Sequence, residues 1–426
     1  MPLSASGQPT SFFDVPGLIR RNIVLFALSQ SFTGAGMQMA YGIGPLMIVA
    51  ISGSASLAGL SVALIAISRF VIAYPLGKIT DTYGRKPGIM MGLVLALAGV
   101  ITVAAAMHGR SLILLISGLL IFSMGMSAAQ QMRVAATDMF PPRMRAQALG
   151  YVALGSLVGL LITPTLIAIS ERTAPQYGLD PMTFPWLILP VLICGGMVLI
   201  SFVKPDPMQI GMNLQKYYPS YTPPANMRGA AAKGEFNAID LLKAPQTRLA
   251  IAANCSGQAN MSIVMVLTSL VLQHQGHSLT EIGYSHMFHS LGMFAFTIPL
   301  GRLADRIGRN PVMYTGVIVA LGGASFVAFG HGIFAVTLGT FLVGIGWAAG
   351  NVAATALVAD SVRTEHRGRA IGLSESFAAG ASLIAALVTG PLIQWSGLWT
   401  AGVVAVVMAG IPLVMYVATP SARAER

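Results

Sequence analysis

The sequence contains little charge and almost no cysteine. Charged side chains make up 9% of its 426 residues, against about 25% in a typical soluble protein. A soluble chain of this length would form more than one domain, and each would need a polar surface that this composition cannot supply. The two cysteines lie in different halves and indicate neither a disulfide framework nor a redox compartment. These shortages exclude a soluble globular protein.

Sequence motifs of enzymes are also missing. The chain has no phosphate-binding loop of the Walker type, no nucleophile–base pair in a recognisable context and no Cys/His cluster with structural zinc spacing. We therefore predict no enzyme activity, no catalytic residue and no bound cofactor. The one long polar stretch, at about 204–247, is too short for a nucleotide-binding domain.

Apolar runs are what the chain has in abundance. Its mean hydropathy is +0.73, and runs of about 20 residues or more, long enough to cross a bilayer, recur along it. The sequence predicts an all-α membrane protein, embedded in the lipid bilayer, with twelve spans at about 22–50, 57–78, 87–107, 111–139, 145–171, 184–203, 248–273, 279–301, 311–330, 332–361, 369–393 and 398–418.

The basic residues indicate how these spans are oriented. With a cytoplasmic N-terminus, 21 of the 25 lysines and arginines fall in cytoplasmic segments, as expected from the excess of Lys and Arg in such loops. The net charge of +11 is thus an orientation signal, and nucleic acid binding is not needed to explain it. We predict a multi-pass membrane protein with both termini in the cytoplasm.

The two halves of the chain repeat a motif. Gly-x-x-x-Asp-x-x-Gly-Arg occurs between spans 2 and 3 and again, 224 residues later, between spans 8 and 9. A second matching pair, Asp138 and Asp360, lies 222 residues apart. This duplication predicts two bundles, residues 1–203 and 248–426, joined by a cytoplasmic linker at 204–247. The repeated motif consists of Gly77, Asp81, Gly84 and Arg85 in the first half and Gly301, Asp305, Gly308 and Arg309 in the second.

The duplicated motif resembles the signature of the major facilitator superfamily, and the resemblance covers essentially the whole chain. It implies a major facilitator fold, with 12 transmembrane helices in two six-helix bundles around a cavity that opens alternately to each side. The glycines permit tight turns and close helix approach, so we expect the motif residues, with Asp138 and Asp360, to act in gating. Proton-coupled efflux, an alternative in this superfamily, is disfavoured because the first span has no acidic residue.

Four residues point to the substrate. Met261 and Met265, and His289 and Met293, form two i,i+4 pairs in spans 7 and 8, so each pair shares one helix face. If these helices are antiparallel neighbours, Met261 lies level with Met293 and Met265 with His289. Thioethers with one imidazole favour Cu(I) over hard cations. The spacing resembles that of the CcoA-type copper importers; the alternative is that these methionines only fill gaps in the packing.

Further residues are candidates for an extended copper site or a helix cap. The candidate accessory metal ligands are His286 and Cys255 within the spans, and His274 and His277 in the turn between spans 7 and 8. Ser278 and Glu281 have the spacing of a capping box that opens span 8. The amide and phenol side chains expected to line the cavity are Gln38, Tyr41, Gln130, Asn254, Gln258 and Asn351.

Two charges inside the spans suggest how the cavity works. Intramembrane charges usually face a cavity or a partner, and the resemblance implies that the helices of Arg69 and Glu375 face each other across the two halves. We expect these residues to form an ion pair that opens and closes during transport. Together with this resemblance, the sequence predicts a monomeric secondary transporter of the bacterial inner membrane that imports copper, as Cu(I). The alternatives are import of riboflavin, which a related branch of the superfamily carries, or of another small organic solute.

Overall fold

The computed structural model describes residues 15–141, 144–219, 238–362 and 367–418, and these form helices joined by short turns, with no strand among them. The first half supplies six spans, and two of these are each broken into two helices. They are α1 Gly17–Gly42 with α2 Gly44–Ser52, α3 Leu60–Tyr83, α4 Arg85–His108, α5 Leu112–Ala129 with α6 Gln131–Asp138, α7 Arg145–Thr173 and α8 Phe184–Ser201.

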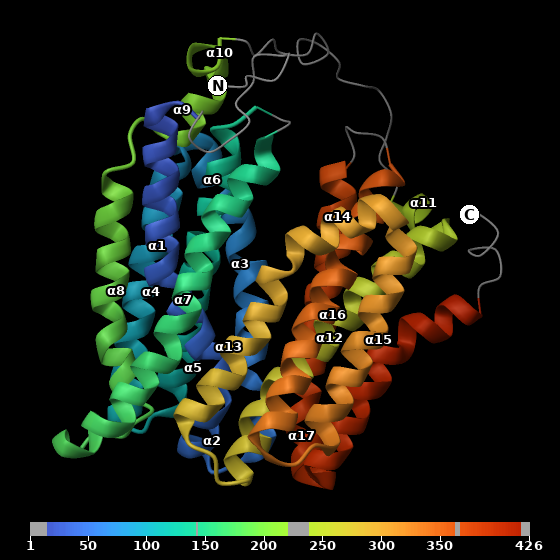
Figure 1. The fold of residues 1–426 in the computed structure, drawn as a ribbon. Helices are drawn as coiled ribbons and strands as arrows, with labels where there is room; N and C mark the ends of the chain where they lie inside the picture. Colours follow the sequence, from blue (N-terminus) through green and yellow to red (C-terminus); the bar gives the residue numbers. More distant parts are fainter. Residues whose placement is uncertain (1–14, 142–143, 220–237, 363–366, 419–426) are drawn as a thin grey trace.

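The second half supplies six more spans, and the two bundles lie side by side (Figure 1). Its helices are α12 Pro245–His274, α13 Leu279–Ala295 with α14 Thr297–Ile307, α15 Arg309–Phe329, α16 Gly332–Asp360 and α17 Arg367–Val417. α17 holds two spans, because Gly397 has φ 85° and ψ 173° and interrupts the helix. This confirms the predicted all-α fold of twelve helices in two bundles.

Nine of the described helices are individually long and apolar enough to cross a membrane, and the bent pair α1–α2 makes a tenth. The pair α13–α14 and the second part of α17 complete the twelve. The first span is bent, since α1 and α2 meet at 46°. The break falls at Ile43, between two glycines and just before Pro45, whose ring cannot continue the hydrogen bonding of α1.

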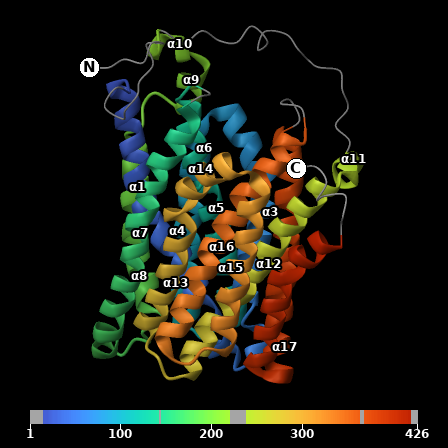
Figure 2. The ribbon, with the colours of Figure 1, turned by 45° about the vertical axis from the view of Figure 1, so that its right-hand side comes forward.

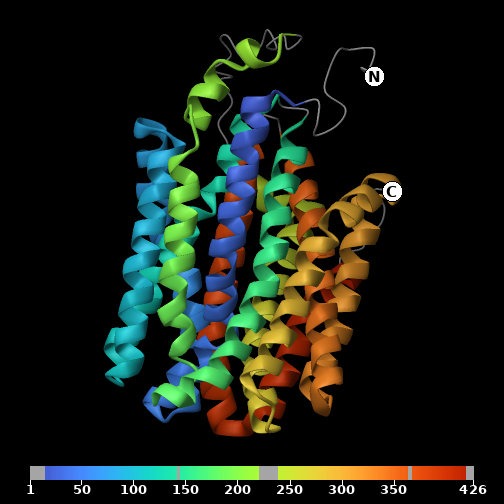
Figure 3. The same cartoon turned by 60° about the vertical axis from the view of Figure 1, so that its left-hand side comes forward.

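The molecule has two ends, here called the linker end and the hairpin end. The linker end carries α9 Pro207–Met212, α10 Leu214–Tyr217 and α11 Ala238–Lys243, and it is uppermost in Figures 1 and 2. The hairpin end carries the turn at residues 275–278 between α12 and α13. In Figure 3, where the first bundle comes forward, α4 and α8 form its outer flank.

The duplicated motif forms the same turn in both halves. Gly84 precedes α4 with φ 103°, and Gly308 precedes α15 with φ 97°, a conformation that glycine adopts without steric cost. Arg85 Nε then lies 2.7 Å from Asp138 Oδ2. In the second half the equivalent atoms of Arg309 and Asp360 lie 3.7 Å apart. The 224- and 222-residue repeats therefore correspond to a repeated structure.

Other members of the motif are less fully described. Gly77 lies within α3 and Gly301 within α14, while the side chains of Asp81 and Asp305 lie outside the described part of the structure.

One residue that the sequence did not reveal supports the first turn. Asp206 Oδ1 accepts from the Arg85 backbone nitrogen at 3.1 Å, and its Oδ2 accepts from that of Lys86 at 2.9 Å, so this carboxylate caps α4 from across the bundle.

Candidate functional site

A cavity of about 390 Å³ lies between the two halves. Its walls come from α1, α3, α6 and α7 of the first bundle and from α12, α13, α16 and α17 of the second. Met261, Met265, His289 and Met293 all line it, so the two i,i+4 pairs face one common space. The first two are 6% and 3% exposed, so their side chains are largely buried.

His289 has one anchored ring nitrogen and one without a partner. Its Nδ1 lies 2.8 Å from the Thr340 carbonyl oxygen. A carbonyl oxygen can only accept, so Nδ1 carries the proton and Nε2 keeps its lone pair. Nε2 is buried and makes no hydrogen bond within the described residues. A histidine held in this way by a backbone carbonyl is the usual arrangement of a metal ligand.

Close packing of α13 on α16 gives His289 this orientation. A Cβ on Gly344 would lie 2.2 Å from the His289 carbonyl oxygen, and a Cβ on Gly292 would lie 2.6 Å from that of Phe341. Because these positions have no side chain, the two helices touch backbone to backbone. The His289 ring therefore reaches the Thr340 carbonyl on the neighbouring helix.

The four accessory candidates do not join this group. His286 is buried against α1 and α12, outside the cavity lining. Cys255 faces a separate pocket between α12 and α17. His274 is exposed at the hairpin end, and His277 Nδ1 lies 3.3 Å from Glu281 Oε1. Across the described chain, no three His, Cys, Asp or Glu side chains gather closely enough to hold a metal ion.

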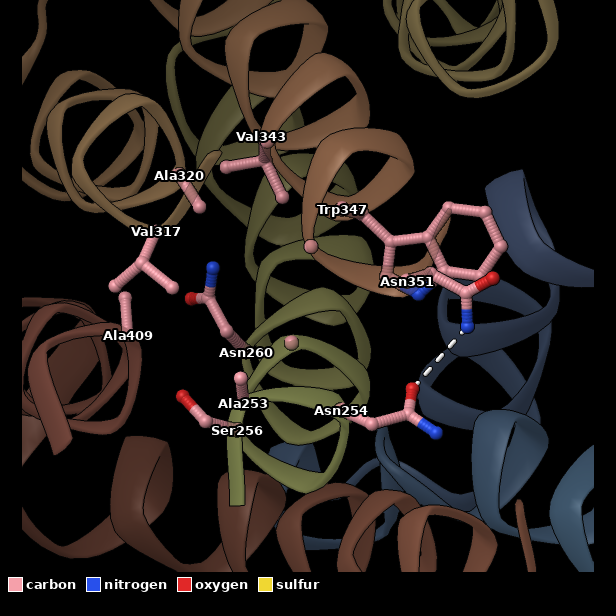
Figure 4. A pocket seen from close by; sticks show the side chains of 13 residues that line it. Ala253, Asn254, Ser256, Asn260, Val317, Ala320, Val343, Trp347, Asn351 and Ala409 are labelled. Carbon is pink, nitrogen blue, oxygen red and sulfur yellow. Dashed lines mark hydrogen bonds between the residues drawn. The ribbon is translucent and has the colours of Figure 1, made fainter. Parts of the chain in front are cut away.

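The amide and phenol side chains divide between two cavities. The central cavity is lined by Gln38, Tyr41, Gln130, Gln258 and Asn351. Asn254 lies instead at a smaller pocket within the second bundle, where its Oδ1 accepts a hydrogen bond from Asn351 Nδ2 at 3.2 Å (Figure 4). The polar lining of the central cavity is therefore shared by both bundles.

Three charged side chains line the central cavity, namely Arg69, Arg133 and Glu375. In this conformation no ion pair joins Arg69 to Glu375, and Glu375 Oε1 accepts from Asn254 Nδ2 at 3.1 Å instead. Sequence reasoning gave Arg133 no role, although an arginine inside a span is itself a signal of a functional site.

The hairpin end of the cavity is closed by direct contact between the bundles. A Cβ on Gly59, just before α3, would lie 1.7 Å from the Ala386 carbonyl oxygen. A Cβ on Gly390 would lie 2.1 Å from the carbonyl oxygen of Ser56. The first part of α17 therefore touches the start of α3 backbone to backbone, as Figure 1 shows by the convergence of the helices at this end.

A carboxylate from the first bundle adds to this closure. Glu171 on α7 accepts from the backbone nitrogens of Leu279 at 2.7 Å and Thr280 at 3.2 Å. The first backbone N–H groups of a helix have no acceptor within that helix, and a negative charge is favourable at this position. Ser269 Oγ also donates to the Gly42 carbonyl oxygen at 2.7 Å. The predicted capping box is confirmed at the same helix start. The carboxylates of Glu171 and Glu281 therefore both cap α13.

Comparison with known protein families identifies the family to which this chain belongs. The model of the Major Facilitator Superfamily matches residues 26–213 and 249–426. The chain belongs to the major facilitator superfamily. It is therefore a multi-pass membrane transporter and no enzyme, as the sequence predicted. The two matched stretches correspond to the two bundles, with the segment between them left unmatched.

Relatives within the superfamily have several cargoes. The chain is 26% identical over 416 residues to the riboflavin transporter RfnT of Brucella anthropi, covering 95% of this chain and 98% of that one. It is 27% identical over 385 residues to the uncharacterised transporter YdeG of Bacillus subtilis, covering 88% and 87%. Among solved structures, it is similar to the inward-open xylose transporter XylE from E. coli, with a TM-score of 0.68, 14% identity and coverage of 93% and 95%.

Proposed function

We propose that this transporter imports copper, as Cu(I), across the bacterial inner membrane. The observation that carries the proposal is the unpartnered Nε2 of His289, on the face where the thioethers of Met261, Met265 and Met293 meet one cavity. Soft sulfur ligands with one neutral imidazole select Cu(I). A hard cation such as Mg²⁺ would instead need oxygen ligands.

The closed hairpin end supports a state that releases cargo to the cytoplasm. The cavity lining includes Thr355 and Ile371, which lie within about two turns of the linker-end termini of α16 and α17. The distribution of basic residues in the sequence supports a cytoplasmic location for the linker end and both termini. Copper would enter when the contacts around Gly59 and Gly390 separate, and would leave after they close again. One chain supplies the whole cavity, so a monomer suffices.

Riboflavin is the second candidate cargo. The specific observation in its favour is the similarity to RfnT over nearly the full length of both chains. The amides of Gln38, Gln130 and Gln258 offer donors and acceptors that an isoalloxazine ring needs, and Trp347 on α16 offers an aromatic surface. In this case His289 would serve as a hydrogen-bond acceptor.

Uptake by cells that express the transporter tests the two cargoes against each other. Copper-64 and radiolabelled riboflavin are supplied separately to cells with the wild type, His289→Ala or Met265→Leu. Met265→Leu keeps the side-chain volume and removes only the sulfur. We expect copper accumulation in the wild type and its loss in both variants.

Matched variants control for non-specific damage. Met313→Leu changes a buried methionine outside the cavity, and His108→Ala removes an exposed histidine; both should transport copper like the wild type. Unchanged copper uptake by His289→Ala would contradict the ligand assignment. Riboflavin uptake without copper uptake would replace the proposed cargo by the second candidate.

A further inference from the structure

Arg133 on α6 is a cation inside the cavity that uses few of its hydrogen-bond donors. Its Nη2 donates to Ser156 Oγ at 3.0 Å, and its guanidinium carbon lies 5.4 Å from the ring centroid of Phe294. The buried Nε makes no hydrogen bond within the part of the chain that the structure describes. A guanidinium has five N–H donors, so an anionic group in this cavity would meet a charged and unsatisfied partner.

Arg69 adds a second positive charge. It lines the same cavity, lies close enough to Arg133 for the two cations to repel each other, and makes no hydrogen bond or ion pair with another described residue. Glu375 is the one carboxylate among the described lining residues, and Asn254 already donates to it. Two cations and one anion leave an excess of positive charge, which repels a bare metal cation.

Arg133 lies beside the helix that carries two of the proposed copper ligands, His289 and Met293. Phe294, which stacks with the guanidinium of Arg133, directly follows Met293 in α13. The arginines belong to the first bundle and the methionines and His289 to the second, so a cargo held by both would bridge the two bundles. A cavity of about 390 Å³ also has room for far more than a single ion.

We propose that Arg69 and Arg133 bind the anionic part of a copper complex, so that the cargo is a small anionic chelate of Cu(I) and not the bare ion. The thioether and imidazole face holds the metal, and the two guanidinium groups pair with the negative charge of its ligand. This inference rests on the proposed function, because it specifies the chemical form in which the copper arrives.

Uptake into proteoliposomes that contain the purified full-length protein tests the inference. Copper-64 is supplied as Cu(I) without oxygen in two forms: the cationic acetonitrile complex, and the anionic complex with sulfur-35-labelled glutathione. Both labels are counted. We expect the wild type to take up the glutathione complex about tenfold faster than the acetonitrile complex, and to carry the sulfur label with the copper. Arg69→Gln and Arg133→Gln should each slow uptake of the anionic complex about tenfold, the loss of one charged hydrogen bond.

Arg172→Gln is the matched control, because it removes an exposed arginine outside the cavity and should leave uptake of both complexes unchanged. Equal uptake of the two complexes by the wild type, copper uptake without the sulfur label, or slowing of both complexes alike in Arg133→Gln would overturn the inference while leaving copper transport intact. Absence of copper uptake in either form by the wild type would instead overturn the proposed function, and the two failures are therefore distinguishable.

Discussion

Adding one methyl group to Gly59 or Gly390 should shift the conformational equilibrium of the transporter. The new Cβ would lie 1.7 Å from the Ala386 carbonyl oxygen in Gly59→Ala and 2.1 Å from that of Ser56 in Gly390→Ala. Backbone atoms in packed helices cannot yield as the tip of a side chain can, so the bundles must separate at the hairpin end. Overpacking of this kind costs about 1–3 kcal/mol, which corresponds to a shift of about 5- to 150-fold between the two states.

Distances between spin labels on the two bundles measure this shift. Cysteines introduced at His108 and His331 carry the labels at the hairpin end, where both positions are exposed. The native cysteines, Cys194 and Cys255, are first replaced by serine. In the parent protein a short distance should predominate, and in Gly390→Ala the population should move to a longer one.

Gly380→Ala provides the control on the same helix. A Cβ at Gly380 meets no atom within 4 Å, so this variant gains only helix propensity, about 1 kcal/mol, and should keep the short distance. If Gly390→Ala also keeps the short distance while it folds normally, the hairpin end is not closed by these backbone contacts, and the inferred inward-facing state is wrong.

Three further predictions follow from contacts in the structure. Glu171→Gln removes the charge that caps α13 from the other bundle and should lengthen the same label distance by weakening closure about fivefold, or about 1 kcal/mol. Asp138→Asn should lower the melting temperature in detergent more than Asp360→Asn, because the latter carboxylate is 56% exposed and 3.7 Å from its arginine, where an ion pair contributes only about 0–1 kcal/mol; the reverse order would contradict this reasoning. If Arg69 and Glu375 pair in the opposite conformation, the double alanine variant should differ from the sum of the single variants in uptake by about 0.5 kcal/mol or more, and full additivity would refute the pairing.

The spans and the duplication could be predicted from the sequence because both depend on local patterns. Apolar length decides whether a segment can cross the bilayer, and the glycines before Arg85 and Arg309 mark turns that few other residues can adopt. The breaks at Ile43 and Phe296 were not predicted, since a run of apolar residues has the same composition whether its helix is straight or bent.

The candidate site could be predicted only in part. Spacing placed His289 and Met293 on one face of a helix, but the rotation of that face depends on the packing of α13 against Gly344 of α16, which no local pattern reveals. Contacts between distant segments were missed for the same reason. Glu171 caps a helix that starts 108 residues later, and Asp206 caps one that starts 121 residues earlier.

X-ray absorption at the copper edge shows which atoms surround bound copper, and so whether the methionine and histidine face binds it. Purified protein is loaded with one equivalent of Cu(I) from its acetonitrile complex, and its spectrum is compared with that of His289→Ala. We expect sulfur neighbours and one imidazole nitrogen in the wild type, with the imidazole signal lost in the variant. A spectrum without sulfur neighbours, or one that His289→Ala leaves unchanged, would contradict this expectation.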